Sequence, residues 1–402
     1  MAESAGASSA ADVVIVGGGV IGSAVAFFLL GEPSFDGRVV VIERDPTYRR
    51  ASSALSASSI RQQFSTPENI RMSRFGWEFL RDVAHRLAVG DADETPPDIG
   101  LVERGYLYLA PERHASTLRE IHAVQRAEGA DVVLLNPDEL AERYPWLALD
   151  GVALGSLGRR GEGWFDGYGL TRAFRRKALS LGADFLGAEV VGLRASDARI
   201  DAVELADGSS IGCGSLVNAA GPWAGEIAAM AGVLLPVAAL RRCFFVFDAP
   251  QPLVDCPLVI DTSGAWFRPE GGSYIGGIPP PESENVAGLP LEVDHRLWEE
   301  ALWPALAARV PAFDAVRLRN AWAGYYEVNT FDHNAILGPH PELANLLFAN
   351  GFSGHGIQQA PAVGRAIAER IVHGRYVSLD LSVFDYDRIA AGRRVVERNV
   401  IG

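Results

Sequence analysis

The sequence predicts an α/β fold organised as two domains. The chain has 402 residues, which is long for a single hydrophobic core. Its first forty-odd residues have the pattern strand, glycine-rich turn, helix, strand. Beyond residue 100, short strand patterns alternate with amphipathic helix patterns, which indicates additional sheet rather than a helical bundle.

Composition narrows the possible classes of protein. Hydrophobic residues make up 48% and charged residues 21%, as in ordinary globular proteins. The net charge of −14 disfavours nucleic-acid binding. The apolar stretch VIGSAVAFFLLG is too short to cross a bilayer, and the first residues lack a signal-peptide pattern. We therefore expect no transmembrane segment and a cytoplasmic or matrix-type location.

Cysteine and histidine residues give no sign of a metal site or of disulfide bonds. The three cysteines, Cys213, Cys243 and Cys256, are an odd number and none of them lie close together in sequence. We expect free thiols in a reducing compartment. The eight histidines are scattered without metal-ligand spacing, so we expect no metal.

The N-terminal stretch ADVVIVGGGVIGSAVAFFLLGE carries a dinucleotide-binding pattern. Gly17, Gly19 and Gly22 fill the three glycine positions of G-x-G-x-x-G, and a helix pattern follows. The next strand, RVVVIERD, contains Glu43 at its end, about 20 residues past the last glycine. The glycines permit a tight turn, close approach to a pyrophosphate and helix–strand packing, and Glu43 can accept ribose hydroxyls. A glycine turn without a ligand is the weaker interpretation.

The segment after Glu43 favours FAD over NAD as the dinucleotide. Nicotinamide-dependent dehydrogenases usually continue with further β-α units. Here residues 46–65 form a serine-rich segment ending near Arg61, whose hydroxyls can donate to a pyrophosphate. A plain solvent-exposed loop is the alternative for this segment.

Three stretches together are similar to a known family. They are VVIVGGGVIGSAVAFFL with VVVIERD, LVNAAGPWA, and the C-terminal WAGYYEVNTFDHNAILGPHPELANLLFANGFSGHGIQQAPAVGRAIAERI. With them the chain resembles the D-amino-acid oxidase-like FAD-dependent oxidoreductases, which include sarcosine oxidase, glycine oxidase and dimethylglycine dehydrogenase. The stretch YYEVNTFDHNAILGPHP most resembles the branch with a mitochondrial flavoprotein associated with complex I assembly.

The resemblance implies a Rossmann-like FAD-binding domain interleaved with a smaller mixed-sheet substrate domain. Residues 1–87, 151–233 and 321–402 would form the FAD-binding domain, and residues 88–150 and 234–320 the substrate-binding domain. It also implies a set of cofactor-binding residues: Gly17, Gly19, Val20, Ile21, Gly22, Glu43, Arg44, Ser52, Ser53, Arg61, Val190, Ala220, Gly221, Trp223, Gly351, Ser353, Gly354, His355, Gly356 and Ile357.

The stretch ANGFSGHGIQQAP, residues 349–361, gains a role from this resemblance. In the family the matching loop surrounds the pyrimidine edge of the flavin. Reduced flavin is negatively charged there, and a glycine-rich loop at the start of a helix supplies N–H donors and the positive end of the helix dipole. His355 can add a donor; a structural histidine in a tight turn is the equal alternative.

Two departures from the family bear on chemistry. No cysteine lies at Gly324 or Tyr325 and no histidine in the serine-rich segment, so we expect FAD to be bound non-covalently. Tyr326 and Gln358 stand where relatives place cations for the substrate carboxylate. Because a carboxylate is expensive to bury unpaired, either an arginine such as Arg61 or Arg268 replaces them, or the substrate is not a small amino acid.

The resemblance implies oxidation of a C–N bond in a secondary or tertiary amine or an amino acid of the sarcosine or dimethylglycine kind. Hydride would move to flavin N5 and the imine would be hydrolysed, with O2 or a redox partner as electron acceptor. The candidate catalytic residues are Tyr326, His355, Gln358 and Arg61. The alternative is a flavoprotein with mainly an assembly or interaction role and weak catalysis.

Overall fold

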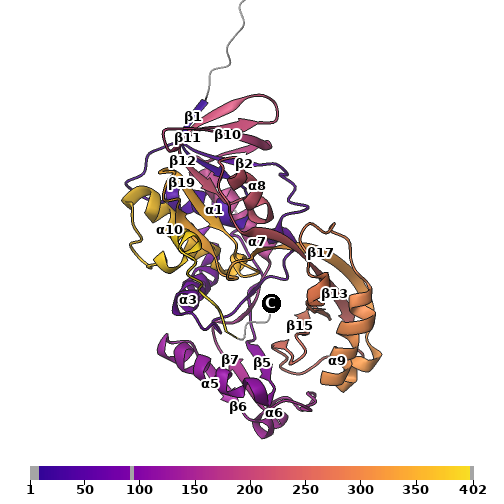
Figure 1. The fold of residues 1–402 in the computed structure, drawn as a ribbon. Coiled ribbons are helices and arrows are strands. Elements are labelled where there is room, and N and C mark those ends of the chain that lie inside the picture. The colour runs from indigo at the N-terminus through magenta and orange to yellow at the C-terminus, as the bar shows by residue number, and fades with distance from the viewer. Residues whose placement is uncertain (1–8, 91–94, 399–402) are drawn as a thin grey trace, which may run out of the picture.

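The structure, a computed structural model, describes residues 9–90 and 95–398 and contains two large β-sheets joined by helices and a small third sheet. The two large sheets lie at opposite ends of the molecule in Figure 1. The α/β class predicted from the sequence is confirmed.

The first sheet has the strand order β10-β11-β12-β1-β2-β9, with β19 pairing with β12 and β18 pairing with β19. Its central strands run parallel, and Val13–Val16 in β1 are buried on both faces, as the apolar run predicts. The strands are β1 (Ser9–Val16), β2 (Val39–Glu43), β9 (Asp184–Gly187), β10 (Val190–Ser196), β11 (Arg199–Leu205), β12 (Ser210–Asn218), β18 (Ile336–Pro339) and β19 (Leu346–Asn350).

Helices cover both faces of this sheet because its residues alternate in direction along each strand. Val13 and Ile15 of β1 belong to the hydrophobic core that includes α1 (Val20–Leu30) and α10 (Gly356–His373), while Val14 and Val16 face α8 (Ala224–Ala229). Helix α1 is the centre of this layer, since it packs against both α10 and α7 (Gly167–Ser180). Helix α3 (Pro67–Arg81) packs on α10, and the short α4 (Val83–Arg86) follows it.

The second sheet has the order β17-β13-β16-β15-β14-β5-β7-β6 and mixes parallel and antiparallel pairs. Its longest strands, β13 and β17, pair antiparallel over most of their length and reach toward the first sheet. The strands are β5 (Tyr106–Ala110), β6 (Val132–Leu135), β7 (Leu154–Gly158), β13 (Val237–Asp248), β14 (Leu258–Ile260), β15 (Trp266–Glu270), β16 (Ser273–Gly277) and β17 (Arg317–Asn329).

The remaining elements cover the second sheet or connect the two sheets. Helices α5 (Glu112–Ala127), α6 (Pro137–Arg143) and α9 (Trp303–Arg309) lie on its outside, and a π-helix at Leu297–Leu302 leads into α9. The third sheet has the order β3-β8-β4. Its strands and the other short elements are β3 (Ser59–Ile60), β4 (Val102–Glu103), β8 (Gly163–Trp164), α2 (Ser52–Leu55), the 3-10 turns η1 (Gly221–Trp223), η2 (Glu282–Glu284), η4 (Pro311–Ala315) and η5 (Ser382–Phe384), and α11 (Asp387–Ala390).

The domain boundaries expected from the sequence stay a prediction, but the strand pairing favours moving one of them. The two sheets draw on interleaved segments of the chain, as the family resemblance implies. However, β7 pairs with β5 and β6 in the second sheet, although the boundary at residue 151 assigned it to the FAD-binding domain. All five residues of β7 are buried in this pairing, so a boundary after residue 158 fits the hydrogen bonding better.

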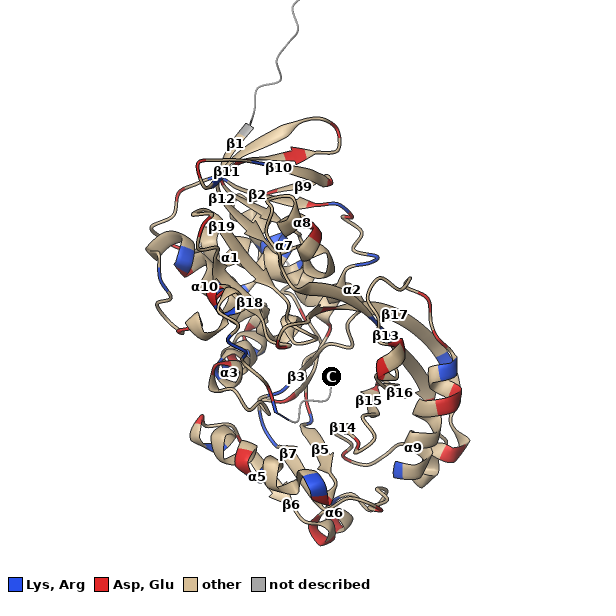
Figure 2. Cartoon of the chain, viewed as in Figure 1, with Lys and Arg blue, Asp and Glu red and all other residues tan. Residues whose placement is uncertain are grey.

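Charged residues lie mainly on the outer helices and loops, and the strands are largely uncharged (Figure 2). Among the described residues, no helix is both long enough and apolar enough to cross a bilayer. Within the same residues, no group of histidine, cysteine, aspartate and glutamate side chains is arranged to hold a metal ion.

Candidate functional site

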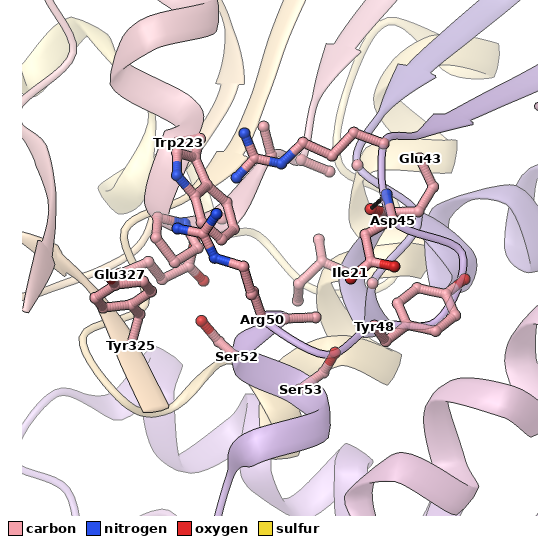
Figure 3. Close-up of a pocket in the computed structure, with 18 of the residues that line it drawn as sticks. Ile21, Glu43, Asp45, Tyr48, Arg50, Ser52, Ser53, Trp223, Tyr325 and Glu327 are labelled. Atoms are coloured by element: carbon pink, nitrogen blue, oxygen red, sulfur yellow. Dashed lines mark hydrogen bonds between the residues drawn. The ribbon is translucent and has the colours of Figure 1, made fainter. Parts of the chain in front are cut away.

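A cavity of about 630 Å³ lies between the first sheet and the long strands of the second. Its walls come from the turn before α1, the end of β2, residues 48–56, residues 188–191, the η1–α8 region, β17 and the start of α10. This volume falls within the range of sites that enclose a whole cofactor. The segments are far apart in sequence and meet only in the folded chain (Figure 3).

The three glycines of the N-terminal motif are required for different steric reasons. Gly17 has φ +104°, and a Cβ on it would lie 2.2 Å from the Ala219 carbonyl oxygen. A Cβ on Gly22 would lie 1.9 Å from the Gly17 carbonyl oxygen, so Gly22 permits the close packing of α1 on the turn. Gly19 is different, because its Cβ would meet only Ser53 Oγ at 3.4 Å, and this residue lines the cavity.

Helix α1 begins at the cavity without a side-chain cap. Gly19 is its N-cap, no side chain accepts a hydrogen bond there, and the first turn holds no acidic residue. The first turn of a helix has free N–H groups and a partial positive charge. The cavity wall at Gly19, Val20 and Ile21 therefore suits the anionic part of a ligand.

Glu43 is fixed at the end of β2 by backbone donors. Its Oε2 accepts from the Gly18 N–H at 2.8 Å and its Oε1 from the Asp45 N–H at 2.9 Å. Each oxygen keeps a lone pair, and the residue lines the cavity. This geometry leaves Glu43 able to accept from a ligand hydroxyl.

Trp223 forms part of the opposite wall and is surrounded by two arginines. The Cζ atoms of Arg44 and Arg50 lie 3.8 and 5.5 Å from its ring centroid, and the Tyr325 ring meets it edge-on at 6.0 Å. Trp223 and Arg50 lie together at this wall in Figure 3. Guanidinium groups over an indole face are favourable and hold the ring in place.

Three buried polar atoms of the cavity wall have no hydrogen-bond partner within the described residues. They are Tyr48 Oη, Ser52 Oγ and Glu327 Oε2. Burial raises the pKa of Glu327 to about 8. Hydrogen bonds from the backbone N–H groups of Gly351 and Phe352 lower this pKa, but the effect of burial is larger. Buried polar atoms are rarely left unpaired, so this wall is suited to a polar ligand.

The C-terminal glycine-rich loop touches the cavity at Gly354, Gly356 and Ile357. Gly354 has φ +94°, and a Cβ there would lie 2.5 Å from Cε2 of the Tyr326 ring. Two other residues expected to bind the cofactor, Gly351 and Ser353, stabilise the loop instead. Ser353 Oγ accepts from the Asn329 N–H and donates to the Gly351 carbonyl, which keeps both residues behind the wall.

Behind this loop lies a buried guanidinium, that of Arg61. Its Nη2 lies 2.8 Å from His355 Nε2, and its backbone N–H donates to Gln358 Oε1 at 2.8 Å. Burial and the neighbouring Arg61 charge lower the pKa of His355 well below its usual value, so the neutral imidazole accepts from the guanidinium. The Nε of Arg61 has no partner among the described residues. The Cζ atom of Arg61 lies 4.8 Å from the Phe64 ring centroid and 5.7 Å from that of Tyr106.

The structure brings most of the expected site residues into one cavity wall. Those that line it are Gly17, Gly19, Val20, Ile21, Glu43, Arg44, Ser52, Ser53, Val190, Ala220, Gly221, Trp223, Tyr326, Gly354, Gly356 and Ile357. Those outside the lining are Gly22, Arg61, Gly351, Ser353, His355 and Gln358. Sequence reasoning missed Tyr48, Arg50, Phe244 and Glu327, of which only Glu327 gave a signal, as an acid in the otherwise uncharged strand AWAGYYEVN.

Comparison with known proteins agrees with this geometry. The chain is 44% identical over 425 residues to FAD-dependent oxidoreductase domain-containing protein 1 of Xenopus laevis, covering 97% of this chain and 85% of that protein. It is 29% identical to glycine oxidase of Geobacillus kaustophilus, covering 94% and 97%. Its fold matches L-proline dehydrogenase from P. horikoshii with TM-score 0.85 at 27% identity, covering 97% and 100%.

A family model described as DAO, FAD dependent oxidoreductase, matches residues 12–370. The uncapped helix start, the glycine turn and the unpaired polar atoms fit an extended dinucleotide. Within the described part of the chain, no cysteine or histidine side chain lines the cavity. The chain therefore belongs to the DAO family of FAD-dependent oxidoreductases, as the resemblance implied, and its cofactor is non-covalently bound FAD.

Proposed function

We propose that this enzyme oxidises a C–N bond of a secondary or tertiary amine or an amino acid that carries a carboxylate, in the manner of sarcosine or dimethylglycine. The names of its relatives support this proposal, since they include glycine oxidase and sarcosine dehydrogenase. When bound, FAD would supply the two-electron acceptor for oxidation of the carbon beside the nitrogen, and water would hydrolyse the imine product.

We propose that different elements of the cavity wall hold different parts of the cofactor. The helix start at Gly19 and the hydroxyl of Ser52 would hold the pyrophosphate, and Glu43 the ribose. Val190 would present backbone to the adenine. The loop at Gly354–Ile357 would supply N–H donors to the ring end of the cofactor.

The observation that carries the substrate proposal is the unpaired charge of Arg61. Among the described residues, no carboxylate oxygen lies within 4 Å of its guanidinium. The charge of the buried acid Glu162 interacts with that of Arg61. However, the two Glu162 oxygens already accept hydrogen bonds, from the Gln62 N–H at 2.7 Å and from Gln63 Nε2 at 2.8 Å. A buried cation is costly unless an anion pairs with it, so a substrate carboxylate is the group this site lacks.

The surrounding residues position Arg61 and exclude water. Gln358 fixes its backbone and His355 fixes Nη2. Burial raises the pKa of Tyr326, so its hydroxyl stays protonated near neutral pH and can act as a donor beside the bound amine. We propose that the expected catalytic residues form two groups, with Arg61 and Tyr326 binding the substrate and His355 and Gln358 as positioning residues.

Anaerobic reduction of the flavin by a panel of amines tests the proposal. We expect sarcosine-like amines to bleach the visible flavin absorbance, and Arg61→Gln to raise the substrate concentration needed by about 10- to 100-fold, the value of a charge-assisted hydrogen bond. The control is Arg159→Gln, which removes an exposed arginine paired with Asp131. A panel without any reducing amine would contradict the proposal and favour the assembly or interaction role.

The electron acceptor is proposed to be a redox partner, with O2 as the alternative. Reoxidation of the reduced enzyme in air, compared with reoxidation by an artificial dye, distinguishes them. Fast reoxidation in air would identify an oxidase.

We propose a cytoplasmic or matrix-type compartment. All three cysteines are free, and Cys243 and Cys256 are buried, as expected in a reducing environment.

A further inference from the structure

A second arginine, Arg242, lies on the sheet face that forms the cavity wall. It sits opposite Gly324 in the β13–β17 register, and the neighbouring pairs on this face are Phe244 with Trp322 and Leu240 with Tyr326. Directly opposed residues of antiparallel strands share a face. Phe244, Gly324 and Tyr326 line the cavity, and Arg242 lies beside them on the same face of the strand pair, although it is not itself part of the cavity lining.

The guanidinium of Arg242 is only partly satisfied by the protein. Nη1 donates to the Arg241 carbonyl at 3.0 Å and to Asn285 Oδ1 at 2.8 Å. Its Nε is buried without a partner among the described residues. In that part of the chain, no carboxylate oxygen lies within 4 Å of it either, so Arg242, which is half-buried, shares with Arg61 an unpartnered Nε and the lack of a paired anion.

Both arginines are linked to Tyr326, Arg242 directly and Arg61 through His355 and the glycine-rich loop. The Cζ atom of Arg242 lies 5.2 Å from the Tyr326 ring centroid. The Arg61 partner His355 follows Gly354, which is pressed against the same ring. Burial raises the pKa of Tyr326, while the positive charges of Arg242 and Arg61 oppose this rise.

We propose that the preferred substrate is an amine with two carboxylates, one held by Arg61 and the other by Arg242 with Asn285. This inference rests on the amine oxidation proposed above and names its substrate class. A substrate with one carboxylate would leave either the buried guanidinium of Arg61 or the half-buried guanidinium of Arg242 without an anion. N-carboxymethyl amines and N-methylated acidic amino acids have the required charges. The oxidised C–N bond is unchanged, and the second carboxylate takes no part in electron transfer.

Binding of two unreactive analogues to the holoenzyme tests the inference without requiring turnover. Thiodiacetate has two carboxylates and (methylthio)acetate has one, and neither has an oxidisable amine. Their dissociation constants are measured from changes in the visible flavin spectrum. We expect thiodiacetate to bind at least about tenfold more tightly, because a second charge-assisted hydrogen bond forms.

Two variants assign this preference to Arg242. Arg242→Gln is expected to reduce the affinity ratio of the two analogues to about one, while Arg242→Lys keeps part of it. Arg241→Gln is the matched control, since its guanidinium already lies 3.9 Å from an anion of the protein, Asp294, and it should keep the full ratio. Equal affinities in the unmodified enzyme, or a tenfold ratio that survives in a folded, FAD-containing Arg242→Gln variant, would overturn the inference.

The amines iminodiacetate and sarcosine separate this inference from the proposed function. Reduction of the flavin by sarcosine alone would refute the two-carboxylate substrate and leave amine oxidation standing. A thiodiacetate preference without reduction by any amine would refute amine oxidation and support the two-cation compartment. Reduction by iminodiacetate at concentrations about tenfold below those of sarcosine would support both.

Discussion

Replacement of Glu327 by glutamine should change how the stability of the FAD-free protein depends on pH. The carboxyl group is buried in the cavity wall, and its Oε2 has no partner among the described residues. A glutamine of the same shape keeps an acceptor toward the loop N–H groups and a donor toward the cavity. It cannot ionise, so the variant isolates the cost of charge at this position.

The magnitude follows from the two pKa values. Burial raises the pKa of Glu327 from 4.5 to about 8. Because the folded state holds the proton more tightly, the stability this group contributes is fully present below pH 4.5 and is lost as pH rises toward 8. The difference of about 3.5 in pKa corresponds to about 5 kcal/mol in total, of which about 2 kcal/mol falls between pH 6 and pH 8.

Urea unfolding of the FAD-free protein at pH 6, 7 and 8, followed by tryptophan fluorescence, measures this difference. The unmodified protein should lose about 2 kcal/mol relative to Glu327→Gln across this range. The control Glu226→Gln removes an exposed acid at the same cavity and should behave as the unmodified protein. Parallel pH profiles for Glu327→Gln and the unmodified protein would refute the reasoning.

Two further predictions concern packing and a buried ion pair. Gly22→Ala places a Cβ 1.9 Å from the Gly17 carbonyl oxygen, so we expect about 1–3 kcal/mol lower stability and reduced FAD content, measured by thermal unfolding and visible absorbance. Gly272→Ala, with no atom within 4 Å of the new Cβ, should change neither, and equal behaviour of the two variants would contradict the steric argument. Asp332→Asn leaves Arg388, whose Nε lies 2.9 Å from Asp332 Oδ2, buried without its anion, and should cost about 3–5 kcal/mol in urea unfolding; a loss below about 1 kcal/mol would show that the pair is dispensable.

The sequence by itself determined the parts of the site that depend on local order. The strand, glycine turn, helix and terminal acid around Gly17 and Glu43 follow from spacing, because Gly22 packs against the nearby Gly17 carbonyl and Glu43 ends the strand that pairs with β1. The uncapped start of α10 after the loop at Gly354 is local in the same sense. The resemblance to the family identified site residues that are distant in sequence, such as Trp223, but not their positions in space.

Only the tertiary structure decided which arginines lie near the proposed substrate compartment. Arg61 follows a two-residue strand, while Arg242 lies opposite Gly324 through a pairing across about 80 residues of chain. A shift of one residue in that register would turn Arg242 and Phe244 to the other face, and nothing local in RRCFFVFD fixes it. Burial likewise set the protonation of Glu327 and His355, since the desolvation that shifts their pKa values exists only once the two sheets close over the cavity.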